Sequence, residues 1–301
     1  SSFLSNSLLS DIYTAYIPWK FFELNSIGSY RIFHEFLRLL TEIIIVYLIY
    51  KLSFVYDLKK NSQSIFLISA LFFSISLNRD LTELFYPFRY RDIPIFILII
   101  LSIDYLKFNR FEYLTPILIG LISLFTLFWS LDRGIYFFVG VFALILYSIL
   151  KKRYFDLILI LFGFATSLII IFSFFDTAEL INFYNNSLII LKNFDVFAGS
   201  TYPTLFDLNN EHSSRGTVNL FIIILNSFFV IYFSLNKDIS LKENSKIIIL
   251  FIFIMSCVIY KSALSVPDGY HMKQSIFLSK IFLFSNILYV FLHNNFLIEK
   301  K

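Results

Sequence analysis

The sequence has little of what most metal-binding and nucleotide-binding motifs are built from. It holds one cysteine, Cys257, and four histidines, so an internal disulfide is excluded and a zinc site of Cys and His ligands is not indicated. Its eight glycines form neither a P-loop nor a dinucleotide-binding pattern, which argues against an ATP-driven pump. We therefore expect no cofactor, with a divalent ion held by outer carboxylates as the alternative.

Charged residues are also scarce, because they make up 15% of the chain against 58% hydrophobic residues. A soluble protein of this size needs more polar residues to cover its surface. Long runs with almost no charge recur along the sequence, as helices that span a bilayer require. We predict an all-α, multi-pass membrane protein that contacts membrane lipids and has no nucleic-acid partner.

Nine apolar ranges are candidate membrane spans: residues 33–56, 64–78, 93–106, 113–130, 134–150, 155–175, 217–235, 246–266 and 273–293. They predict a single transmembrane domain over residues 1–301. Several ranges are shorter than the roughly 20 residues that a bilayer asks for, so their boundaries are soft. The chain opens on Ser1 in a polar stretch, and we expect a missing upstream segment with at least one membrane helix.

Two segments are expected at the outer membrane surface. Residues 1–30 mix aromatic and charged side chains, as interfacial helices do. Residues 176–216 form the one long extracytoplasmic loop, and its first part carries Leu180, Ile181, Tyr184 and Leu188 at helical spacing. We predict that this first part is a helix lying on the membrane, followed by a polar, turn-rich stretch.

Lysine and arginine set the predicted orientation. One alternate set of loops carries 13 basic and 7 acidic residues, a net charge of +6, and the other set, with residues 1–42, carries 11 basic and 14 acidic residues, a net charge of −3. Cytoplasmic loops are enriched in Lys and Arg, so the +6 set is predicted to be cytoplasmic. This chain would then start outside and end inside the plasma (inner) membrane.

Charged and aromatic residues gather in three of the predicted outer loops. The first, at residues 78–92, contains Arg79, Asp80, Glu83, Arg89, Arg91 and Asp92. The planar arginine fork suits phosphate, and the carboxylates offer a base, so this loop is a candidate site. The alternative is a solvated loop in which arginine and aspartate pair with one another.

The other two clusters are shorter. Asp132 would cap a helix that starts near Gly134, which leaves Arg133 to bind an anion or to extend toward lipid headgroups. Asp268 belongs to a Pro-Asp-Gly turn, and a lone histidine such as His271 is more often structural than catalytic.

Ionisable residues also fall within the predicted spans. They are Arg31, Glu35, Arg38 and Glu42 on one face of the first span, and Lys261 and Lys280 toward the outer ends of the last two. Charged groups in a membrane are costly and favour a functional role, here a polar cavity that opens outward. The alternative is that Arg38 and Glu42 neutralise each other.

The sequence resembles the C-type superfold of integral-membrane glycosyltransferases. The features that carry the resemblance are the interfacial stretch at residues 8–23, the charged loop at residues 78–92 and the segment Trp129-Ser130-Leu131-Asp132-Arg133-Gly134. The resemblance implies an outward-facing site that uses polyprenyl-phosphate-linked sugars. The acidic residues of the family's first outer loop would correspond to Asp11 and Glu23, which stand in a different motif context.

We therefore expect a glycosyltransferase that moves a sugar from a polyprenyl-phosphate carrier to an acceptor on the extracytoplasmic face. The catalytic candidates are Asp80, Asp11 and Glu83, and the substrate-binding candidates are Arg79, Arg89, Arg91, Asp132, Arg133, Lys261, Asp268 and His271. One alternative is an O-antigen-type polymerase or ligase that acts through Arg215 and His212. Another is a transporter or flippase of lipid-linked saccharides, although ionisable residues gathered toward the outer third favour the enzyme.

Overall fold

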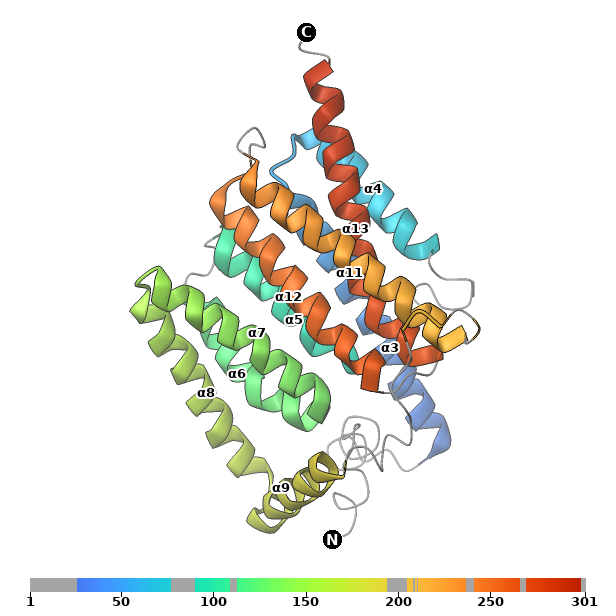
Figure 1. Cartoon of the computed structure of the whole chain (residues 1–301). Helices are drawn as coiled ribbons and strands as arrows, with labels where there is room; N and C mark the ends of the chain where they lie inside the picture. The colour runs from blue at the N-terminus through green and yellow to red at the C-terminus, as the bar shows by residue number, and fades with distance from the viewer. Residues whose placement is uncertain are drawn as a thin grey trace. The chain divides into compact units, whose positions relative to one another are not determined.

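A computed structural model describes residues 26–76, 90–108, 113–193, 205–207, 209, 211–236, 241–265 and 269–298. Every regular element in these ranges is helical, which confirms the predicted all-α class for the described part of the chain (Figure 1). Five stretches are long and apolar enough to cross a membrane: Leu131–Leu150, Tyr154–Phe174, Ser213–Leu235, Glu243–Lys261 and Ser275–His293. These helices are consistent with a multi-pass membrane protein, and the other predicted spans stay predictions.

The chain divides into two compact units. Unit 1 comprises Ser1–Ile44, Arg89–Tyr105 and Asn109–Ala198, and unit 2 comprises Ile45–Phe88, Leu106–Phe108 and Gly199–Lys301. Helix α3, Ile27–Val55, contributes its first part to unit 1 and its last part to unit 2.

Unit 1 is built around three helices that lie side by side in Figure 1. They are α6 (Leu114–Trp129), α7 (Leu131–Leu150) and α8 (Tyr154–Phe174). Helix α6 packs against both α7 and α8, and α5 (Ile93–Ile103) packs against α7. A short 3₁₀ turn, Tyr90–Asp92, leads into α5, which has proline in its first turn where a missing N–H costs nothing.

Glycines bring α6 and α8 into close contact. A Cβ added to Gly120 would lie 2.0 Å from the carbonyl oxygen of Ile160, and one added to Gly163 would lie 2.1 Å from that of Ile117. Small residues let the backbones of membrane helices approach in this way. The spacing between α6 and α8 therefore depends on both glycines.

We expect Gly120→Ala to destabilise the protein, because the new methyl group meets backbone that cannot rotate away. Overpacking of this kind costs about 1–3 kcal/mol. Gly28→Ala is the matched control, since a Cβ there meets only Ser26 Oγ at 3.9 Å. Thermal unfolding in detergent compares the two variants, and equal midpoints would show that α6 and α8 can separate at no cost.

The turn between α6 and α7 differs from the prediction. The second helix was expected from Gly134, but α7 begins at Leu131, directly after Ser130 in extended conformation (φ −159°, ψ 122°). Gly134 lies in the first turn, and a Cβ there would be 2.7 Å from the Cα of Leu127. This glycine permits a close helix approach rather than a loop, and the early start places Asp132 and Arg133 in the first turn of α7.

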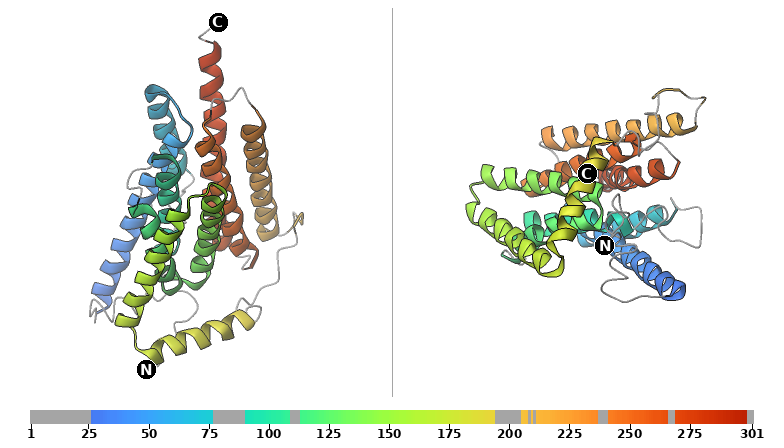
Figure 2. Two further views of the ribbon diagram at one scale, coloured as in Figure 1. Left: turned by 90° about the vertical axis from the view of Figure 1, so that its left-hand side faces the viewer. Right: turned by 90° about the horizontal axis from the view of Figure 1, so that it is seen from below.

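The predicted surface helix is present as α9, Thr177–Lys192. It follows α8 after Phe175 and Asp176 and turns away from the α8 axis (Figure 2). The ring of Phe128 on α6 stacks with Phe175 at 5.2 Å and with Phe183 of α9 at 4.6 Å between centroids. Ile181 is exposed on α9, as a helix on a membrane requires, and that location stays a prediction.

Unit 2 contains α4 (Lys60–Ser76), α11 (Glu211–Leu235), α12 (Glu243–Ser265) and α13 (Gly269–Ile298). Helix α13 packs against the other three, and α11 packs against α12. The helix that contains the span predicted from residue 217 begins six residues earlier, at Glu211, because polar residues continue the helix beyond its apolar part. The end of the predicted segment 176–216 is therefore helical from Glu211 onward.

Neutral polar groups hold the interior of unit 2 together. Tyr56 donates to Asn286 Oδ1 at 2.7 Å, and Asn286 Nδ2 donates to Asn226 Oδ1 at 3.3 Å. Asn226 Nδ2 donates in turn to the carbonyl oxygen of Ser279 at 2.9 Å. These bonds satisfy buried amides without any charge, so we assign them a structural role.

One end of unit 2 gathers loops that were predicted to lie on the same side of the membrane. Lys107 Nζ donates to Val55 O at 3.0 Å, Asp57 Oδ1 at 2.9 Å and Ser245 Oγ at 2.8 Å. Burial would raise the pKa of Asp57, but hydrogen bonds from Lys107 and Ser245 outweigh burial and hold it below its usual value. The ammonium has three acceptors, so this cluster fastens helix ends together.

In unit 1 as well, loops that were predicted to lie on the same side of the membrane lie at the same end. Arg91 bonds Ser130 at one end, and Tyr105 bonds Asp156 at the other. Loops assigned to the same side by their alternation therefore do meet within the unit. Which end faces the cytoplasm stays a prediction.

Candidate functional site

The structure describes four of the predicted site residues in full: Arg91, Asp132, Arg133 and Lys261. Outside the described residues lie Asp11, Arg79, Asp80, Glu83, Arg89 and Asp268. His271 belongs to the first turn of α13, where the structure describes the backbone alone. Lys261 is exposed on α12, in unit 2.

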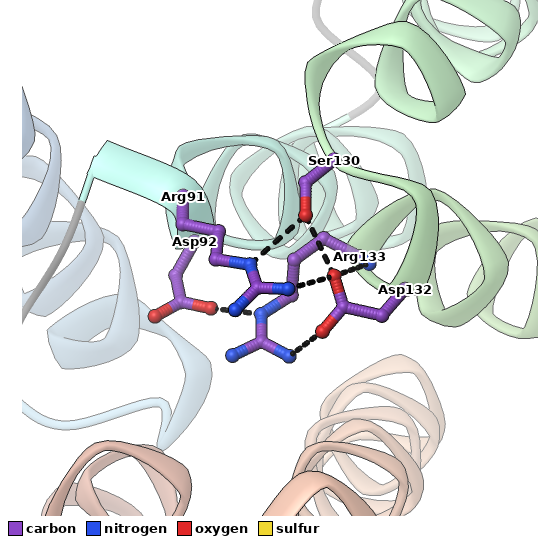
Figure 3. A network of polar contacts seen from close by, with 5 residues as sticks. All are labelled: Arg91, Asp92, Ser130, Asp132 and Arg133. Carbon is purple, nitrogen blue, oxygen red and sulfur yellow. Dashed lines mark hydrogen bonds and ion pairs between the residues drawn. The ribbon is translucent and has the colours of Figure 1, made fainter. Parts of the chain in front are cut away.

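Arg91, Asp132 and Arg133 come together in one cluster at the start of α5 and α7. Figure 3 shows them with Asp92 and Ser130, and with the two guanidinium groups pointing toward the two carboxylates. Arg91 and Asp92 come from the 3₁₀ turn before α5, Ser130 comes from the junction between α6 and α7, and Asp132 and Arg133 come from the first turn of α7. The two segments are about 40 residues apart in sequence and both belong to unit 1.

Arg133 is the centre of the cluster. Its Nε donates to Asp92 Oδ1, and its Nη1 donates to Asp132 Oδ2 at 2.8 Å. The guanidinium carbon also lies 5.5 Å from the ring centroid of Tyr136. The side chain of Arg133 is 0% exposed, so it does not extend toward lipid headgroups as one alternative had it.

Asp132 connects the two arginines. Its Oδ1 forms an ion pair with Arg91 Nη2 at 2.8 Å and accepts hydrogen bonds from Ser130 Oγ at 2.6 Å and from the backbone N–H of Arg133 at 2.8 Å. Arg91 Nε donates to Ser130 Oγ at 3.0 Å. Asp132 is therefore not the cap of a helix starting at Gly134 but a bridge within the first turn of α7.

The cluster is electrically balanced, with two guanidinium cations and two carboxylates. A buried ion pair is strongly destabilising when one partner is removed, by about 3–5 kcal/mol, because the other charge is left uncompensated. Helices α5 and α7 both begin here, and the N-terminus of a helix adds a partial positive charge. The two helix N-termini therefore add a positive field to a cluster whose side-chain charges cancel.

One donor in the cluster has no acceptor. Arg133 Nη2 is buried and makes no hydrogen bond to any residue that the structure describes. An unsatisfied buried donor costs about 1–3 kcal/mol, so its presence calls for an explanation. Nη2 of the Arg133 guanidinium group can therefore donate a hydrogen bond to one further anionic oxygen.

Sequence reasoning found Arg91, Asp132 and Arg133 but not how they combine. Asp92 was assigned to one loop and Arg133 to another, and Ser130 was not singled out. The signal that links them is the predicted topology, because it puts both loops on the same side of the membrane. Their pairing supports, for these residues, the alternative in which arginine and aspartate neutralise each other.

The charged face of α3 shows a similar pairing. Arg38 bonds Glu35 at 2.8 Å and Glu42 at 3.0 Å. The ion pair with Arg38 therefore explains how a charged residue, Glu42, is accommodated in the middle of this helix.

No three His, Cys, Asp or Glu side chains gather to hold a metal ion in the part of the chain that the structure describes. Comparisons with protein-family models, curated protein sequences and solved structures find no match to this chain. Evidence about function therefore comes from the chain's own residues.

Proposed function

We propose that the protein is a membrane glycosyltransferase. It transfers a sugar from a polyprenyl-phosphate carrier to an acceptor on the extracytoplasmic face of the plasma membrane. The observation that carries the proposal is the fully buried Arg133, which keeps one guanidinium nitrogen without a partner at the start of α7. The resemblance of the sequence to the C-type superfold supports the same function.

The position of the cluster suits a lipid phosphate. The polar end of a membrane helix lies near the headgroup level, where the phosphate of a polyprenyl carrier lies. Two arginines supply the planar donors that bind phosphate best. Bonds to a charged oxygen are worth more in a buried site than in water, and two helix N-termini add to the positive field.

The distribution of buried charge favours an enzyme over a transporter. Among the described residues, the charged side chains in the most buried class are Lys51, Asp92, Arg133 and Asp156. Each of them lies close to the end of a helix, and Glu42, which is half-buried in the middle of α3, is paired with Arg38. A pathway for an anionic saccharide would place such groups through the middle of the spans.

In the proposed reaction an acceptor hydroxyl attacks the anomeric carbon of the donor. The bond between that carbon and the phosphate oxygen breaks, polyprenyl phosphate leaves, and the hydroxyl proton goes to a carboxylate base. Arg91 and Arg133 stabilise the charge that develops on the leaving phosphate. The base is proposed among Asp80, Asp11 and Glu83.

The test is a transfer assay with the purified full chain in nanodiscs. A panel of polyprenyl-phosphate-linked hexoses is offered with a soluble alkyl glycoside acceptor, and released polyprenyl phosphate is measured. We expect release that depends on the identity of the sugar. If no donor is consumed while proteoliposomes containing the protein move a labelled lipid-linked saccharide across the bilayer, the protein is a flippase and the proposal is wrong.

A further inference from the structure

We propose that Asp132 is a displaceable counter-ion that occupies the anion site of this cluster until a phosphate group replaces it. This inference rests on the proposed function for the source of the phosphate, a prenyl phosphate ester. The exchange itself follows from the geometry of unit 1.

Asp132 occupies the place that a bound phosphate would take. Its Oδ1 is ion-paired with Arg91 Nη2 and its Oδ2 accepts a hydrogen bond from Arg133 Nη1, each at 2.8 Å. One carboxylate thus bridges two guanidinium groups with two separate oxygens, as two oxygens of a phosphate do. The difference is that a phosphate monoester, such as the polyprenyl phosphate released in the proposed reaction, has a third terminal oxygen.

The unpartnered donor fits that further oxygen. Arg133 directs Nε to Asp92 and Nη1 to Asp132, while Nη2 is buried without an acceptor. A carboxylate has no third oxygen to offer it. A phosphate that entered between Arg91 and Arg133 would satisfy the donor that Asp132 leaves unpaired.

The exposed fractions of the two aspartate side chains indicate which carboxylate can leave the cluster. The Asp132 side chain is 32% exposed, whereas that of Asp92 is 6% exposed. Asp132 can therefore move to solvent and recover hydration, while Asp92 stays in place and holds Nε of Arg133. The side chain of Arg91 is 13% exposed, against 0% for that of Arg133.

Charge balance favours exchange over simple addition. The cluster is neutral as it stands, so an added anion would leave a net negative charge in a poorly hydrated site, which is unfavourable. If Asp132 moves out as a phosphate enters, the two guanidinium groups keep a matching negative charge. The internal carboxylate thereby keeps the site folded and neutral when no donor is bound.

The test is the affinity of Asp132→Asn for phosphate compounds. The amide keeps the shape of the side chain but removes the competing charge, so we expect farnesyl phosphate to bind about 10-fold tighter than to the wild type, a change of about 1.4 kcal/mol. Isothermal titration of the full chain in detergent measures this. In the transfer assay the same variant is expected to show a lower KM together with a lower kcat, because the phosphate product leaves more slowly.

Two variants separate this role from general effects. Asp156→Asn removes the same charge at the other end of unit 1, where Asp156 accepts from Tyr105, and is expected to leave the affinity unchanged. Ser130→Ala removes the hydrogen bond from Ser130 Oγ to Asp132 and also frees Nε of Arg91, so it is expected to tighten binding in the same direction by a smaller factor. If Asp132→Asn fails to fold, Ser130→Ala still tests the exchange.

The outcomes are distinct. Unchanged or weaker farnesyl phosphate binding by a folded Asp132→Asn variant, or by Ser130→Ala alone, overturns the exchange and leaves the transferase proposal standing. Tighter binding of inorganic phosphate, with no binding of farnesyl phosphate, supports the exchange and contradicts a lipid-borne donor. Vesicles of phosphatidylglycerol are the third arm, and tighter binding to them alone would show that an ordinary lipid headgroup replaces Asp132, which overturns the assignment to a prenyl phosphate.

Discussion

Replacing Arg133 by lysine is expected to lower sugar transfer by about 10²-fold, the effect of removing one donor from a charge-stabilising site. A lysine keeps the positive charge but offers a single nitrogen. It cannot donate to Asp92 and to Asp132 along a planar fork and still present a free edge to the donor phosphate. The transfer assay measures the loss, and thermal unfolding checks that the variant is folded.

Arg153→Lys is the matched control for this variant. Arg153 lies at the other end of unit 1, with its guanidinium carbon 5.7 Å from the Tyr105 ring centroid. We expect transfer by this variant to be close to normal. Near-normal transfer by Arg133→Lys as well would show that Arg133 serves only to hold the cluster together.

Asp80→Asn is expected to reduce turnover by about 10²–10⁴-fold, the usual contribution of general acid–base catalysis. The amide keeps the shape and hydrogen bonding of the side chain but cannot accept the acceptor's proton. Donor binding is expected to persist, because Arg91 and Arg133 rather than Asp80 are proposed to hold the phosphate. Asp80 lies outside the described residues, so this prediction rests on the sequence, where Arg79 and Arg91 stand nearby.

Two further variants separate the candidates for the base. If Asp80→Asn turns over normally and Asp11→Asn is inactive, the base belongs to the first outer segment. Glu83, three residues after Asp80, is the remaining candidate and is tested in the same assay as Glu83→Gln. If all three variants retain activity, the assignment of these loops to glycosyl transfer is wrong.

The helices were predictable from the sequence because their apolar runs are long and nearly free of charge. Their ends were less predictable. Gly134 was taken as a turn residue, yet it lies inside α7. It is a glycine because a side chain at this position would collide with Leu127 of α6. A contact between two backbones leaves no periodic trace in the sequence, so its position could not be predicted.

The candidate site was predictable in its parts but not in its geometry. The sequence marked Arg91, Asp132 and Arg133 because charge is rare in a chain this apolar. It could not show that Asp132 bridges two arginines, or that Arg133 keeps one nitrogen unpaired. Those facts depend on how α5 and α7 pack, which brings two distant turns together.

The most direct test of an outward-facing site is the sidedness of the helix ends in each unit. In a Cys257→Ser background, single cysteines are placed at Lys152 and Asp176, the two ends of α8 in unit 1, and at Asn61 and Gly269 in unit 2. Intact spheroplasts are then treated with a membrane-impermeant maleimide, and labelling is compared with that of lysed cells.

We predict that the cysteines at Asp176 and Gly269 react in intact spheroplasts, whereas those at Lys152 and Asn61 react only after lysis. That result places the Arg91–Asp132–Arg133 cluster on the extracytoplasmic side, because it lies at the same end of unit 1 as Phe175, which stacks on Phe128. The reverse pattern would put the cluster in the cytoplasm and contradict a transferase that draws on a lipid-borne donor outside the cell.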